Sequence, residues 1–158
     1  MEQNLISYFS LFPHVQAEAR IMAVKSLMQR AEVDETAYRL LARLAEKHLY
    51  TFGSPMQNEE YFIPFLEEIV GTSLLDETEK SRFRFLLSAA LKNRPGTMAT
   101  DFTYLTPNGE LQTLYTVPAT YRLLLLFYDP DCLHCREIIT ALSTASCLQQ
   151  QIESGQLT

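Results

Sequence analysis

The stretch LLLLFYDPDCLHCREI, Leu123–Ile138, decides how the C-terminal part of the chain folds. Its first six residues form a continuous apolar run, which is typical of a strand buried on both faces of a sheet. Cys132 and Cys135 follow this run. After them, apolar residues return at helical spacing to about Gln151: Ile138, Ile139, Leu142 and Leu148. The sequence therefore predicts a buried strand, a cysteine pair at a helix start, and the helix itself.

The residues before this stretch predict a β-hairpin. Arg94-Pro95-Gly96 breaks the preceding helical pattern, and Asp101–Leu105 is rich in aromatic and β-prone residues. Asn108-Gly109 is a strong turn signal between that segment and Leu111–Val117. We expect two antiparallel strands here, followed by the buried strand and the helix.

In the first part of the chain, from residue 4 to about residue 93, the dominant period is helical. The apolar spacing and the capping residues predict four amphipathic helices: 14–30, one N-capped by Asp34, one from Asn58 to Gly71, and one opened by a capping box of Asp76 and Glu79. Pro64 should kink the third helix or mark its true start, because its ring clashes with the carbonyl four residues earlier. Residues 1–93 are expected to form an all-α unit.

Composition and charge argue against nucleic-acid binding and against a membrane span. The 158 residues are 47% hydrophobic, which suffices for one ordinary domain or two small ones. A net charge of −6 offers no basic face for phosphate backbones, so nucleic acid is not an expected partner. The longest apolar run, Leu123–Tyr128, is far shorter than the roughly 20 residues of a membrane span. The start MEQNLISYF has no signal-peptide pattern, which permits a cytosolic protein or a mature exported one.

Two cysteines separated by two residues at a helix start can perform redox chemistry. Their sulfurs lie within disulfide reach, and the helix N-terminus stabilises the thiolate of the first. Cys132 would attack a substrate disulfide, and Cys135 would then displace the product and close the internal disulfide. A protonated His134 would favour the thiolate, whereas Asp129 and Asp131 would oppose it. The balance of these charges, and with it the direction of electron flow, stays open.

The cysteines have two other interpretations. The CxxC spacing also supplies half of many zinc sites. The chain has no second CxxC and no HxxxH motif, so a zinc site would have to recruit Cys147 and one of three histidines: His14, His48 or His134. We therefore expect no metal and no cofactor. Cys147 lies in the middle of the predicted last helix, where a buried packing role is expected.

The order of these motifs carries a family resemblance. The residues concerned are Pro95-Gly96, Ala99, Asp101-Phe102, Asn108-Gly109, the run ending in Phe127-Tyr128, and Cys132-Leu133-His134-Cys135. Over about 94–158 the chain resembles the thioredoxin-like family related to periplasmic thiol-disulfide reductases and peroxiredoxins. Residues 1–93 resemble a domain of unknown function that precedes such modules in Gram-negative envelope proteins. The resemblance implies Cys132 as nucleophile, Cys135 as resolving thiol, protein thiols and disulfides as partners, and the periplasm or cell envelope as location.

Two features depart from that family pattern. The position before the first cysteine, usually a tryptophan, is Asp131, and the chain has no tryptophan. The family fold continues with a further strand, a cis-proline loop, an antiparallel strand pair and a helix, whereas this sequence stops at Thr158. We therefore expect a fragment with weak catalysis. The strand Leu123–Tyr128 would then carry a hydrophobic edge that invites homodimerisation.

The predicted fold class is α+β: an all-α unit over 1–93, then a β-hairpin and a β-α unit of a truncated thioredoxin-like fold over 94–158. The predicted function of the parent protein is thiol-disulfide exchange by the CxxC pair. The alternative is an interaction module, in which the helical unit binds a partner or tethers the redox domain and the cysteine pair does no turnover.

Overall fold

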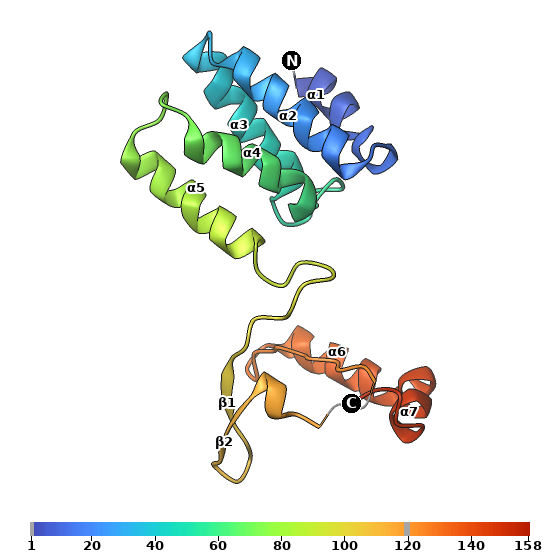
Figure 1. Cartoon of the computed structure of the whole chain (residues 1–158). Coiled ribbons are helices and arrows are strands. Elements are labelled where there is room, and N and C mark those ends of the chain that lie inside the picture. Colours follow the sequence, from blue (N-terminus) through green and yellow to red (C-terminus); the bar gives the residue numbers. More distant parts are fainter. Residues whose placement is uncertain (1, 119–120) are drawn as a thin grey trace. The chain divides into compact units, whose positions relative to one another are not determined.

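The chain has an α+β fold, seen in a computed structural model that describes residues 2–118 and 121–158 (Figure 1). It separates into two compact units, and the boundary between them in the sequence falls between residues 100 and 101. In its described residues the first unit is all-α and contains α1 (Glu2–Phe9), a 3₁₀ turn (Phe12–His14), α2 (Ala17–Ala31), α3 (Glu35–Leu49), α4 (Glu59–Gly71) and α5 (Glu77–Ala90). The predicted fold class is confirmed.

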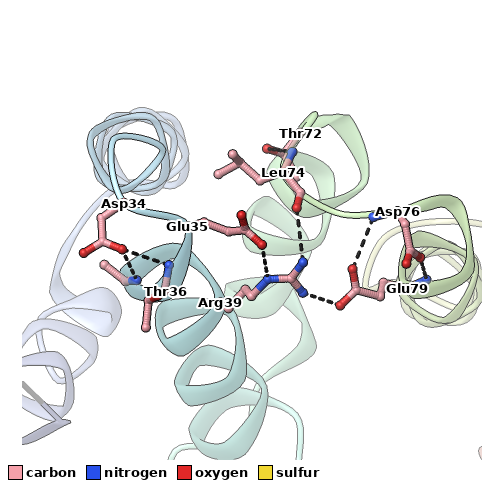
Figure 2. Close-up of polar contacts among 9 residues, drawn as sticks. Asp34, Glu35, Thr36, Arg39, Thr72, Leu74, Asp76 and Glu79 are labelled. Carbon is pink, nitrogen blue, oxygen red and sulfur yellow. Dashed lines mark hydrogen bonds and ion pairs between the residues drawn. The ribbon is translucent and has the colours of Figure 1, made fainter.

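Side-chain caps fix the starts of α3 and α5, as the sequence predicted. The Asp34 carboxylate accepts hydrogen bonds from the N–H groups of Thr36 at 2.9 Å and Ala37 at 3.2 Å. The Asp76 carboxylate accepts the Glu79 N–H at 2.8 Å, and the Glu79 carboxylate accepts the Asp76 N–H at 3.2 Å (Figure 2). Each cap satisfies backbone donors that a helix start would otherwise leave unpaired.

Helix α4 tolerates a proline in its interior. The helix runs from Glu59 to Gly71, as predicted, with Pro64 inside it. Pro64 therefore does not mark the start of the helix, and that alternative was wrong. Pro64 and its neighbours Ile63 and Phe65 are buried. Burial of this apolar face offsets the backbone hydrogen bond that the proline cannot make.

The core of the first unit is built around α4, which packs against α2, α3 and α5. Its largest fully buried side chains are Phe9, Val24, Met28, Tyr38, Leu49, Phe62, Phe65, Leu66 and Ile69. Tyr38 ties α3 to α4, because its hydroxyl donates to the Glu68 carbonyl at 3.1 Å. Burial raises the pKa of Tyr38 to about 12.

The segment after α5 folds back on the first unit. Arg94 makes a two-pronged ion pair with Glu60 of α4, at 2.8 Å and 2.6 Å. Asn93 has a φ of 54°, and its side-chain oxygen accepts the Thr100 N–H at 2.6 Å. These contacts hold residues 94–100 to the helical unit.

The second unit opens with the predicted hairpin. It consists of β1 (Thr103–Leu105) and β2 (Leu111–Thr113), with Tyr104 opposite Gln112. Gly109 has a φ of +80°, which a glycine adopts without strain, as the predicted turn requires. β2 is shorter than expected, because a 3₁₀ turn over Leu114–Thr116 replaces its last residues.

The apolar run Leu123–Tyr128 is not part of a sheet. It makes a parallel type of pairing at one point, where the Leu124 N–H donates to the Thr158 carbonyl and the Thr158 N–H donates to the Arg122 carbonyl, both at 2.9 Å. Leu124 is 51% exposed and Phe127 76%. The prediction of a strand buried on both faces is wrong for this chain. Such burial needs neighbouring strands and covering helices. Among the described residues, the run has backbone pairing only with Thr158.

The predicted last helix is two helices. α6 (Leu133–Thr144) ends and α7 (Ser146–Glu153) begins at Ala145, whose ψ of 109° is not helical. The N-cap residue Ala145 and, within α7, Leu148 and Gln151 are half-buried, and Cys147 lies beside this stripe. Cys147 is exposed, so the predicted packing role is wrong.

Among the described residues, no helix has the length and apolar character that a membrane crossing requires.

Candidate active site

The two cysteines meet at the first turn of α6. Cys132 is the N-cap residue, and Cys135 lies three positions later. The backbone N–H of Cys135 donates to the Sγ of Cys132 at 3.4 Å. Both thiols are free and half-buried. The structure thus brings together the two residues that the sequence predicted.

The surroundings of Cys132 favour its thiolate. A side-chain hydrogen bond from Cys135, with the backbone N–H groups of Cys135 and His134, lowers the pKa of Cys132 from its ordinary value, against a smaller effect of desolvation. The sulfur takes the place of the usual N-cap oxygen and accepts the N–H of Cys135, one of the donors that a helix start leaves unpaired.

His134 acts on the site in a way that the sequence did not indicate. Its backbone N–H makes the smallest contribution to the lowered pKa of Cys132. Its imidazole Nδ1 lies 3.5 Å from a carboxylate oxygen of Glu137, and both side chains are exposed. The lowered pKa of Cys132 thus comes first from the side chain of Cys135 and then from backbone N–H groups of the first helical turn.

A short hydrogen-bonded loop holds Cys132 at the helix start. The Asp129 carboxylate accepts the Asp131 N–H at 2.9 Å, and the Asp129 carbonyl accepts the Cys132 N–H at 3.1 Å. Arg136 donates from Nε and Nη2 to the Pro130 carbonyl, at 3.0 Å and 2.9 Å. Sequence reasoning missed Arg136. The available signal was an arginine in the first turn of the helix, from which a guanidinium can reach back to the preceding loop.

The hairpin supports the apolar run that leads into this loop. Phe102 and Phe127 make an edge-to-face contact with ring centroids 5.5 Å apart. Around them, apolar side chains of the hairpin and the run, including Leu114, Leu123 and Leu125, line a cavity of about 310 Å³. The cysteine pair therefore stands at the end of a segment that rests on the hairpin.

Within residues 2–118 and 121–158, no group of three or more His, Cys, Asp or Glu side chains could hold a metal ion. The zinc site considered from the sequence would need Cys147 and a histidine beside the pair. His48 belongs to the first unit, where its Nε2 is 2.9 Å from the Glu2 carboxylate.

Comparisons with known proteins relate both parts of the chain to others. Residues 1–93 match a family described as a domain of unknown function (DUF5106). The crystal structure of a thioredoxin-like protein from Bacteroides caccae ATCC 43185 is similar over 99% of this chain, with 36% identity and a TM-score of 0.86. The match covers 56% of that protein, so the present chain spans little more than half of its length. No curated protein matches the chain.

Proposed function

Since this chain belongs to the DUF5106 family and shares its fold with a thioredoxin-like protein, we propose that it exchanges thiols and disulfides through Cys132 and Cys135. One observation carries the proposal: the Cys135 N–H points at the Cys132 sulfur from the first turn of a helix. This geometry supports a stabilised thiolate with a second thiol three residues away, which is the equipment that disulfide exchange needs.

The reaction proceeds in two displacements. The Cys132 thiolate attacks one sulfur of a substrate disulfide, forms a mixed disulfide, and releases the other sulfur as a thiolate that takes a proton from solvent. The Cys135 thiol then loses its proton and attacks the Cys132 sulfur, which closes the internal disulfide and releases the second substrate thiol. The substrate gains two electrons and the cysteine pair loses two. The reverse sequence oxidises a substrate dithiol.

The lowered pKa of Cys132 bears on the direction of exchange. When the protein stabilises the Cys132 thiolate, the reduced form of the pair becomes more stable. The reduction potential then becomes less negative, so the disulfide form is a stronger oxidant. The measured potential, compared with that of the compartment, gives the direction.

The proposed setting is the periplasm or cell envelope. Its support is the family resemblance of residues 94–158 together with the chemistry, since protein disulfides persist in oxidising compartments. Fractionation of cells, with the chain detected in each fraction, tests it. Recovery in the cytosolic fraction alone would contradict it.

The test of the function is a glutathione redox titration of the purified chain, read by thiol alkylation and intact mass. A reversible two-electron transition should map to Cys132 and Cys135. Cys132→Ser should abolish exchange, and Cys135→Ser should trap a mixed disulfide at Cys132. Cys147→Ser is the matched control, because that exposed thiol lies outside the pair, and it should behave as the parent does. Unchanged exchange in Cys132→Ser would refute the proposal.

A further inference from the structure

A groove of about 400 Å³ lies between α3 and α5 of the first unit. Ala42 and Leu75 are buried and Phe83 is half-buried, and these three side chains form its apolar surface. Helices α3 and α5 each pack against α4. The groove is open along one side rather than enclosed.

Two reciprocal ion pairs join the helices across the groove. Arg39 of α3 pairs with Glu79 of α5, and Arg82 of α5 pairs with Glu46 of α3. Positions 39 and 46 are about two helical turns apart. The two pairs therefore fix the spacing of the helices at two separate levels, so that the groove is already formed before anything binds.

Other contacts hold both arginines in place. Arg39 donates to the Glu35 carboxylate at 2.8 Å and to the Leu74 carbonyl at 3.3 Å (Figure 2). The Arg82 guanidinium lies 5.2 Å from the centre of the Phe83 ring, within cation–π range. The positive charges of these two arginines are thus already matched by carboxylates of the chain.

Arg43 is different from these two arginines. It lines the same groove from the α3 side and is exposed. Within the part of the chain that the structure describes, no hydrogen bond or ion pair engages its guanidinium. Glu79 is the acid on the groove lining, and it is committed to Arg39. The groove therefore offers an unmatched positive charge beside an apolar surface, on a chain whose net charge is −6.

We propose that this groove binds a segment of a partner protein in which an apolar side chain stands next to a carboxylate. The apolar side chain would pack on Ala42, Leu75 and Phe83, and the carboxylate would pair with Arg43. An open groove between two helices suits a side chain presented by a peptide, because small-molecule sites enclose most of their ligand. The inference concerns the helical unit and does not rest on the thiol chemistry of the second unit.

The test uses two blocked hexapeptides titrated into the isotope-labelled full chain and followed by amide chemical shifts. The acidic probe is acetyl-Gly-Glu-Leu-Glu-Phe-Gly-amide, and its match is acetyl-Gly-Lys-Leu-Lys-Phe-Gly-amide. The acidic peptide should produce saturable shifts centred on the groove residues of α3 and α5. The lysine peptide should bind at least about tenfold more weakly, since its charges repel Arg43.

Two variants test the assigned contacts. Arg43→Glu should weaken the acidic peptide about tenfold, because it replaces an attraction by a repulsion at a surface site. Thr78→Trp should fill the groove from its exposed edge and abolish binding, whereas Ser88→Trp, at an exposed site of α5 outside the lining, should bind like the parent. Circular dichroism confirms that each variant is folded. Absence of saturable shifts at millimolar peptide, equal binding of both peptides, or unchanged binding by Arg43→Glu would overturn the proposal.

Discussion

Replacement of Tyr38 by Phe tests the contact that holds α3 against α4. The Tyr38 hydroxyl is fully buried and donates to the Glu68 carbonyl at 3.1 Å. The same carbonyl also accepts the Thr72 N–H at 3.0 Å, so the substitution does not leave it unpaired. The expected loss at neutral pH is therefore that of an ordinary hydrogen bond, about 1 kcal/mol, without a desolvation penalty for the acceptor.

At alkaline pH, Tyr38→Phe should become more stable than the parent chain. The pKa of Tyr38 is raised from 10.0 to about 12 in the folded chain, chiefly by burial. The folded state therefore keeps its proton while the unfolded state loses it, and the parent loses stability as pH rises from 10 to 12. The loss reaches about 2 kcal/mol at pH 12. At a pH between roughly 10 and 11, this loss becomes larger than the contribution of the hydrogen bond. At higher pH, Tyr38→Phe is therefore the more stable protein.

Denaturant unfolding followed by circular dichroism measures this difference. Parent, Tyr38→Phe and the control Tyr121→Phe are compared at neutral pH and at several alkaline values. Tyr121 is 78% exposed, so its variant should follow the parent at every pH. Other titrating groups are common to all three proteins and cancel in the comparison. A stability difference between parent and Tyr38→Phe that stays constant with pH would refute the reasoning.

Four further outcomes are expected. Alkylation of Cys132 should have a lower pH midpoint in the folded chain than in urea, because its pKa is lowered on folding, and equal midpoints would contradict this. Arg136→Met removes two hydrogen bonds to the preceding loop and should destabilise the second unit by about 1 kcal/mol in denaturant unfolding. Asp76→Ala should cost about 1 kcal/mol of thermal stability and Asp76→Asn much less, because asparagine also caps a helix. Sedimentation should show a concentration-dependent dimer formed through the exposed apolar run, and Leu124→Lys should shift it to monomer; a parent that stays monomeric would disprove this.

Features that depend on near neighbours in the chain were predictable from sequence. Asp34 and Asp76 cap their helices through donors two or three residues away, and Gly109 makes its turn through its own φ. The cysteine pair belongs to the same class. Its geometry follows from three residues of one helical turn. Local chemistry determines such features whatever the rest of the fold does.

Features that depend on distant or three-dimensional surroundings were not predictable. The apolar run Leu123–Tyr128 has the composition of a doubly covered strand, but burial is set by what lies beside it. The break at Ala145 has no proline or glycine to announce it. Arg136 stands in the first turn of its helix, but its bonds to the Pro130 carbonyl depend on how the preceding loop folds. The groove between α3 and α5 likewise arises from helix packing and crossed ion pairs.

The ion pair between Arg94 and Glu60 affects where the helical unit can be cut from the chain. The DUF5106 match ends at residue 93, one residue before this arginine. A recombinant piece that stops there would leave the Glu60 carboxylate without the guanidinium that lowers its pKa. It would also lose Thr100, which bonds to the side chain of Asn93. A piece that ends at residue 100 keeps both contacts, so its helical unit should melt at a higher temperature and resist proteases longer.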